Sequence, residues 1–224
     1  MRTKKTRTKI SMLSDRDFFQ ITIGECLMDY SQVFGNRNPI YIEIGSGKGE
    51  FISRYPTYYP ENNYIGFEVR DKRINNILKK LVPERNPNVR LACVHIDQKI
   101  TNFLPEASVS GAFIQHPDPW PKKRHFKRRL FNQAFLDALA KVLKPDAFVQ
   151  VSTDHVEYAD WIVQEFLKNQ NYKSKYEEIT TEHPVLDEHV VTWFEQEQRR
   201  LGYAPKFMLF NKISTISKPA EEEK

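Results

Sequence analysis

Between residues 40 and 167, short runs of β-branched and aromatic residues alternate with longer segments of helical periodicity. The short runs predict strands at 40–44, 64–69, 89–96, 109–114 and 148–152. Strands that alternate with helices form βαβ units, in which the strands lie parallel and the helices cover both faces of the sheet. The alternation therefore predicts an α/β fold with a mostly parallel, doubly wound sheet.

The segments after residue 120 complete this expected domain. The longest amphipathic stripe covers 126–143 and predicts one helix that begins at Phe126. Further helices are expected at 156–167 and 190–201, and alternation at 203–210 predicts a last strand. The chain then divides into an N-terminal basic extension with one short helix (1–37), a single domain (38–212) and a charged C-terminal tail (213–224).

Positive charge is concentrated in two places. The chain has 34 Lys and Arg against 29 Asp and Glu, a formal net charge of +5. Residues 1–10 hold five basic side chains and 122–129 hold six, and neither segment holds an acid. Without these eleven, acids outnumber bases. Two cationic segments on a mildly acidic body predict a polyanionic partner, although a flexible tail and a solvated helix face are the alternatives.

Composition also excludes several classes of protein. No run approaches the roughly 20 apolar residues of a membrane-spanning helix, and no secretory signal is expected at the N-terminus. The two cysteines, Cys26 and Cys93, are too few for a disulfide framework or a cysteine-ligated metal site, which favours a reducing cytoplasm. His95 and His116 lie near acids, but without the tight spacing of metal ligands, so no metal is expected.

A glycine loop follows the first predicted strand, where residues 43–50 read E-I-G-S-G-K-G-E. Gly45, Gly47 and Gly49 allow a tight turn and close approach of the backbone to a ligand. The third glycine of a dinucleotide-binding loop is replaced by Glu50, and the loop also fails the P-loop pattern. With Glu43 in front, it suits a ligand with a cationic end and no phosphate, such as S-adenosylmethionine. A plain tight turn is the alternative.

Acidic residues follow the second and third predicted strands. Glu68 comes 19 residues after Gly49, a spacing typical of the acid that holds ribose hydroxyls. Asp97 could accept a hydrogen bond from an adenine amino group, or it could cap a turn. Both side chains are expected at the carboxyl edge of the sheet, where such folds bind their ligands.

The fourth predicted strand runs into H-P-D-P-W-P at 116–121. Its three prolines make the loop rigid and present Asp118 and Trp120 at the ligand edge. A fixed carboxylate beside an aromatic ring fits the binding of a planar base. Amino-group methyltransferases that act on adenine have an [ND]-P-P-[YFW] loop at this place, and the pattern is only partly met here.

Polar residues with two possible roles follow this loop. The cations of 122–129 would lie in the first turn of the predicted helix, where the macrodipole disfavours them, which indicates a bound anion such as an RNA phosphate. Asp154 has capping-box spacing to Glu157, so it could cap the next helix, contact a ligand, or both. The aromatic and polar residues at 192–195 begin the predicted helix at 190–201.

Together these segments resemble the bacterial tRNA (guanine-N7)-methyltransferases over roughly 38–212. The matching motifs are 43–49, G-F-E-V at 66–69, P-D-P-W at 117–120 with the following 122–129, S-T-D at 152–154, and T-W-F-E at 192–195 with Gly202. The resemblance implies a Rossmann-like class I methyltransferase fold that transfers a methyl group from S-adenosylmethionine to guanine 46 in the tRNA variable loop. Two departures are Trp193, where the family has Lys, and His116, where it commonly has Phe or Asn.

The resemblance also implies roles for individual residues. It implies cofactor contacts at Glu43, Gly45, Gly47, Gly49, Glu68, Asp97 and Asp118, with Asp118 also in catalysis. It implies substrate contacts at Lys122, Asp154, Thr192, Trp193, Phe194 and Glu195. It implies RNA contacts at Arg124, His125, Lys127, Arg128 and Arg129.

The chemistry of guanine agrees with this interpretation. Its N7 has a free lone pair and no proton, so methyl transfer needs no general base, and the protein has to position the reactants and stabilise positive charge. Two other functions stay open: an adenine amino-group methyltransferase, and an RNA-binding module that kept the fold without catalysis. Either a monomer or a homodimer is compatible with the sequence.

Overall fold

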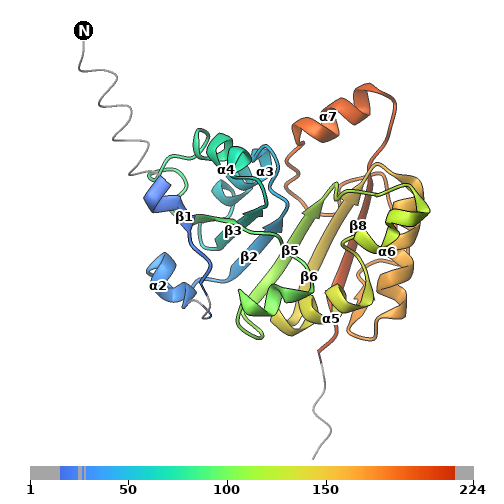
Figure 1. Cartoon of the computed structure of the whole chain (residues 1–224), viewed down its shortest axis with the longest axis horizontal. Helices are drawn as coiled ribbons and strands as arrows, with labels where there is room; N and C mark the ends of the chain where they lie inside the picture. The colour runs from blue at the N-terminus through green and yellow to red at the C-terminus, as the bar shows by residue number, and fades with distance from the viewer. Residues whose placement is uncertain (1–15, 25–26, 28, 215–224) are drawn as a thin grey trace, which may run out of the picture.

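The computed structural model describes residues 16–24, 27 and 29–214, which form one eight-stranded sheet in the order β1-β4-β3-β2-β5-β6-β8-β7 (Figure 1). Every neighbouring pair from β1 to β6 is parallel, and β8 runs antiparallel to both β6 and β7. The strands are β1 (Gln20–Ile21), β2 (Ile40–Ile44), β3 (Asn63–Glu68), β4 (Val89–Cys93), β5 (Val109–Gln115), β6 (Leu143–Thr153), β7 (Tyr172–Ser174) and β8 (Lys206–Lys212). The predicted α/β fold class is confirmed.

Helices connect most of the parallel strands and cover both faces of the sheet (Figure 1). The α-helices are α2 (Tyr30–Phe34), α3 (Glu50–Arg54), α4 (Asp71–Leu78), α5 (Gln133–Val142), α6 (Val156–Lys168) and α7 (Trp193–Arg200), and the 3-10 helices are η1 (Tyr55–Thr57), η2 (Gln98–Asn102) and η3 (Lys123–Arg128). The central strands are buried on both sides because successive side chains enter opposite cores. In β5, for example, Phe113 belongs to one core cluster, and Ala112 and Ile114 to the other.

The order of the strands reverses beside β2. From β2 the chain adds β3 and then β4 on one side, and β5 and then β6 on the other. In sheets of this type, ligands bind in the crevice at the carboxyl ends of the two strands where the order reverses. These ends are followed by the glycine loop after β2 and by residues 116–121 after β5. The fold therefore brings the two most specific sequence motifs to one crevice.

The helix predicted at 126–143 is wrong for residues 126–132, which are not part of α5. Residues 123–128 form the short helix η3, and α5 begins only at Gln133, where the Asn132 side chain accepts a hydrogen bond from Phe135 N. The cations of 122–129 therefore do not lie in the first turn of a long helix, and the macrodipole argument for a bound anion does not hold for them. Their role as a phosphate-binding segment has to rest on exposure and position instead.

The described part of the predicted N-terminal extension joins the sheet. β1 pairs with β4, Phe19 is fully buried, and Tyr30 donates a hydrogen bond to Phe103 O at 2.8 Å. The basic residues at 1–10 and residues 215–224 of the C-terminal tail lie outside the described residues. Within the described part of the chain, no helix is long and apolar enough to cross a membrane.

Candidate active site

The glycine loop after β2 is held by backbone hydrogen bonds. Gly45, Gly47 and Gly49 have φ angles of 86°, 55° and 80°, a region that strongly favours glycine. A Cβ on Gly49 would lie 2.6 Å from Ile77 of α4, so glycine is required there for packing as well. Gly45 N and Ser46 N both donate to Phe67 O at the end of β3. The loop is thus fixed against the neighbouring strand.

Glu43 lies buried in β2, two residues before the glycine loop. Its side chain is 4% exposed, and one carboxylate oxygen has no hydrogen-bond partner among the described residues. Burial raises the pKa of Glu43 to about 8, and the nearby carboxylates of Glu50 and Glu68 act in the same direction. A cation placed beside a buried acid of this kind stabilises the ionised carboxylate. The site therefore fits a ligand that brings a positive charge to the glycine loop.

Glu68 ends β3 and connects the glycine loop to the turn before α4. It accepts hydrogen bonds from Gly47 N and Arg70 N, both at 3.0 Å, and its carboxylate lies 3.4 Å from Arg73. The side chain is only 2% exposed. Glu68 thus lies at the predicted place beside the glycine loop. Asp97 follows β4 and accepts from Lys99 N at 2.8 Å, which gives it the turn-capping role that was the alternative to a ligand contact.

The loop after β5 has a strained backbone. His116 and Trp120 have φ angles of 49° and 44°, which non-glycine residues rarely adopt and which cluster at functional sites. Asp118 is exposed between them. The loop is held from two sides, because His116 N donates to Ser152 O of β6 and Arg129 Nε donates to Pro119 O at 2.9 Å. A carboxylate and an aromatic ring are therefore presented at the crevice on a fixed backbone.

The basic segment 122–129 contains exposed cations and one buried one. Lys122, Arg124, Lys127 and Arg128 are exposed, and His125 is half-buried against Trp120. Arg129 differs, with 3% exposure and its guanidinium 3.7 Å from the centre of the Phe126 ring and 4.8 Å from that of Trp161. Its burial contradicts the expected phosphate contact. Arg129 supports the loop of Asp118 instead.

Asp154 does not cap α6. His155 is the capping residue, with Nδ1 accepting from Tyr158 N at 3.3 Å, while Asp154 pairs with His116 Nδ1, also at 3.3 Å. Burial alone would raise the pKa of Asp154, but the hydrogen bond and charge of His116 outweigh it and lower the pKa. The pair joins the end of β6 to the loop of Asp118, so Asp154 lies at the crevice.

α7 begins beside the glycine loop. Thr192 caps the helix by accepting from Glu195 N, and Lys48 Nζ lies 2.9 Å from the centre of the Trp193 ring. Trp193 and Phe194 are 47% and 40% exposed, whereas Glu195 is fully buried. The carboxylate of Glu195 lies 2.8 Å from His189 Nε2 and accepts from Arg199 Nε at 2.9 Å. This buried ion-pair cluster withdraws Glu195 from direct contact with a substrate. Trp193 and Phe194 stay exposed, and the Phe194 ring lies 5.0 Å from the His116 ring.

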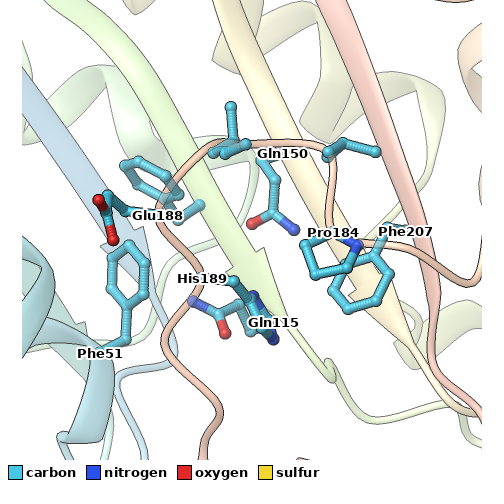
Figure 2. A pocket seen from close by; sticks show the side chains of 10 residues that line it. Phe51, Gln115, Gln150, Pro184, Glu188, His189 and Phe207 are labelled. Atoms are coloured by element: carbon cyan, nitrogen blue, oxygen red, sulfur yellow. The ribbon is translucent and has the colours of Figure 1, made fainter.

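A small pocket lies below the segment that leads into α7 (Figure 2). Pro184 and His189 of that segment lie close to Gln150 of β6 and Gln115 of β5, whereas the Glu188 carboxylate points away from both glutamines (Figure 2). His189 and Gln115 were not singled out from the sequence, because no spacing connects residues 74 positions apart. Both line this pocket, and Gln115 is the last residue of β5, directly before the loop of Asp118. Among the described residues, no three His, Cys, Asp or Glu side chains gather as a metal site would require.

Comparison with known proteins first gives the class. Residues 37–208 match the family model described as a putative methyltransferase. A single-substitution mutant of the 16S rRNA (adenine(1408)-N(1))-methyltransferase from Catenulisporales acidiphilia, solved with cosubstrate SAM, has the same fold. Its TM-score is 0.59 over 88% of this chain and 98% of that one, at 16% identity. The chain is thus a member of the methyltransferase class.

The particular family follows from relatives of known name. A tRNA (guanine-N(7)-)-methyltransferase of Francisella philomiragia is 33% identical over 83% of this chain and 80% of its own length. Another, of Syntrophotalea carbinolica, is 36% identical over 66% of this chain, and the match spans 63% of that protein's length. This chain belongs to the tRNA (guanine-N(7)-)-methyltransferase family.

Proposed function

We propose that this chain transfers a methyl group from S-adenosylmethionine to N7 of a guanine in tRNA, and that the target is guanine 46 of the variable loop. The similarity to the tRNA (guanine-N(7)-)-methyltransferases is the observation that carries this proposal. The geometry supports it, because an unpaired buried acid, a glycine loop and a rigid loop with an exposed carboxylate meet at one crevice. A tRNA substrate also agrees with the cytoplasmic location expected from the sequence.

The cofactor half of the site consists of the glycine loop and its acids. S-adenosylmethionine, when bound, supplies an electrophilic methyl group on a positively charged sulfur. Glu43 accepts the positive end of the ligand, which removes the cost of a buried acid without a partner. Glycines 45, 47 and 49 let the backbone approach closely. Glu68, which already accepts from Gly47 N, would hold the ribose hydroxyls, and Asp97 would accept from the adenine amino group.

The target base enters on the side of β5. The bound cofactor would supply the methyl group to guanine N7, whose free lone pair needs no general base, so the residues on this side have to hold the base and balance the positive charge that it gains. Asp118 stabilises that charge as it develops, and the rigid loop keeps the carboxylate in place during the reaction. Lys122, Asp154, Thr192, Trp193 and Phe194 surround the base, and the exposed cations Arg124, Lys127 and Arg128, with His125, contact RNA phosphates.

The experiment that tests this function is methyl transfer from labelled S-adenosylmethionine to tRNA from cells that lack N7-methylguanine. The expected product is N7-methylguanosine, placed at position 46 by borohydride and aniline cleavage of the RNA. Labelled N6-methyladenosine would support the adenine enzyme instead. Cofactor binding without any transfer to RNA would support a module that has lost catalysis.

A further inference from the structure

His116 is a buried residue at the candidate active site to which the family resemblance assigns no role. It follows β5 directly, and its side chain is only 5% exposed. Its φ angle of 49° is one that residues with a Cβ rarely adopt and that recurs at functional sites. The contacts of the His116 ring show what this strained position holds in place.

The first contact of the ring is with Asp154, directly after β6. His116 Nδ1 lies 3.3 Å from Asp154 Oδ1. Burial alone would raise the pKa of Asp154, but the hydrogen bond from His116 lowers it, so the carboxylate is ionised at neutral pH. Because an ionised carboxylate only accepts hydrogen bonds, Nδ1 carries a proton and donates it. Asp154 is 21% exposed and its Oδ2 has no hydrogen bond to another described residue, so this oxygen can accept from a ligand.

The second contact of the ring is with α7. The His116 and Phe194 rings lie 5.0 Å apart between their centres, at an interplanar angle of 54°. The other ring nitrogen of His116, Nε2, is buried and has no hydrogen-bond partner among the described residues. The bond to Asp154 is therefore the one hydrogen bond of the ring within the described part of the chain, and Phe194 packs beside it.

The strand order places Asp154 across the crevice from the glycine loop. β5 lies between β2, which leads into the glycine loop, and β6, which leads into Asp154. In guanine, N7 belongs to the five-membered ring, and the N1–H and N2–H donors lie across from it on the six-membered ring. A base whose N7 faces the glycine loop therefore turns these donors toward Asp154. Adenine has neither donor there, and its bare N1 would face the carboxylate.

We propose that His116 is a positioning residue that aims the Asp154 carboxylate at the N1–H and N2–H donors of the target base, and so sets the preference for guanine. This rests on the proposed function, because it takes guanine as the target. His116 acts without touching the base: its Nδ1–H fixes one oxygen of Asp154, and Phe194 limits rotation of the ring. A site built to hydrogen-bond a donor rejects an analogue that lacks the donor, because the acceptor is then left unpaired.

The test compares tRNA that has guanine at position 46 with tRNA that has hypoxanthine there. Hypoxanthine keeps N7 and N1–H but lacks the 2-amino group. With it, wild-type kcat/KM should fall about tenfold to a hundredfold, because one hydrogen bond to a carboxylate is lost. His116→Phe keeps a ring beside Phe194 but has no donor, so this preference for guanine should largely disappear.

The matched control is His116→Asn. Its side-chain N–H can take the place of Nδ1–H, and asparagine tolerates a positive φ, so the variant should keep most of the preference. The preference is a ratio measured on one enzyme, so a smaller folded fraction of either variant cancels from it. In a chain that carries Asp154→Ala, His116→Phe should change the ratio no further, because the two residues act as one unit.

Equilibrium binding of the two RNAs, measured beside the rates, separates this proposal from the proposed function. If wild-type protein forms N7-methylguanosine and His116→Phe keeps the wild-type preference, the positioning role is overturned and the function stands. The role is also overturned if His116→Asn loses the preference as fully as His116→Phe, or if wild-type protein shows no preference in either assay. If wild-type protein makes no N7-methylguanosine but its binding preference for the guanine RNA depends on His116, the positioning role stands and the proposed reaction fails.

Discussion

The two halves of the candidate site are built from different kinds of contact. Around Glu43 and Glu68, backbone N–H groups of the glycine loop donate to Phe67 O and to the buried Glu68 carboxylate, which fixes the loop against β3. Around Asp118, the loop is positioned by side chains from distant elements: Arg129 reaches Pro119, and His116 pairs with Asp154. The glycine loop with Glu43 and Glu68, here called the cradle, is preformed for a small ligand. The loop at 116–121 with Asp118, here called the platform, has a geometry that depends on a few long side chains.

The largest effect is expected at the platform, in Asp118→Asn. The amide keeps the shape of the side chain but removes the charge that offsets the cationic base, so turnover at saturating substrates should fall on the order of a hundredfold to a thousandfold. Because Asp118 is exposed, the thermal midpoint should not change. Single-turnover methyl transfer measures the rate. A near wild-type rate would reduce Asp118 to a turn residue and remove the catalytic role from this half.

The cradle is tested by Glu43→Gln, whose two effects should have opposite signs. The folded chain raises the pKa of Glu43 from an ordinary 4.5 to about 8, so ionisation opposes folding, and stability is lost as pH rises from about 4.5 to 8. The glutamine variant avoids this loss. Without cofactor it should melt above wild type at about pH 8.5 and close to wild type near pH 4.5.

The same variant should bind S-adenosylmethionine about tenfold to a hundredfold more weakly, because a charge-assisted contact worth about 1.5–3 kcal/mol is gone. In wild-type protein, cofactor binding at neutral pH should release a proton, which calorimetry in buffers of different ionisation enthalpy detects. Glu61→Gln, on an exposed turn, is the control for loss of one negative charge. A glutamine variant with wild-type affinity would show that Glu43 is structural.

Neighbouring arginines give a matched test inside the platform. Arg129→Gln should lower the free energy of unfolding by about 1.5–3 kcal/mol, because a buried charged donor to Pro119 O is removed, and the midpoint should fall by about 3–12 °C. Arg128→Gln, on an exposed side chain, should leave the midpoint unchanged and reduce the salt slope of tRNA binding by about 0.7–0.9. Thermal melts and anisotropy titrations on both variants check this. If the two variants had equal effects in both assays, Arg129 would not be the residue that holds the loop of Asp118.

The cradle could be predicted from sequence and the platform only in part. β2 and the glycine loop are encoded by a contiguous segment, and the expected strand at 40–44 is observed with the same bounds. The predicted helix start at Phe126 was wrong. The apolar periodicity runs without a break from 126 to 143, across the observed cap at Asn132. Phe126 itself packs on Arg129 and Trp161 outside α5. The helix begins at the local cap of Asn132, a signal that the longer apolar stripe obscured.

Other misses have different origins. Asp154 and Glu157 have the spacing of a capping box, but His155 takes the cap, and Asp154 is recruited by His116, 38 residues earlier. Glu195 was expected to contact substrate and instead lies in a buried cluster with His189, which no spacing rule connects to it. β1 and β7, of two and three residues, are too short to give a periodic signal.

The smallest expected effect concerns the contact that ties the glycine loop to α7, whose Phe194 ring lies 5.0 Å from the His116 ring in the other half. Lys48 of the glycine loop lies 2.9 Å from the centre of the Trp193 ring, at the position where the family has Lys in place of Trp. A partly exposed cation–π contact is worth about 0.5–1 kcal/mol, so Trp193→Ala should raise KM for tRNA about two- to fivefold. Trp193→Lys should behave similarly, since it replaces attraction to Lys48 with repulsion. Leu201→Ala, on an exposed residue beyond the helix, is the control. If Trp193→Phe, which keeps an aromatic face, loses as much as Trp193→Ala, the ring itself is not the contact, and α7 is not tied to the glycine loop there.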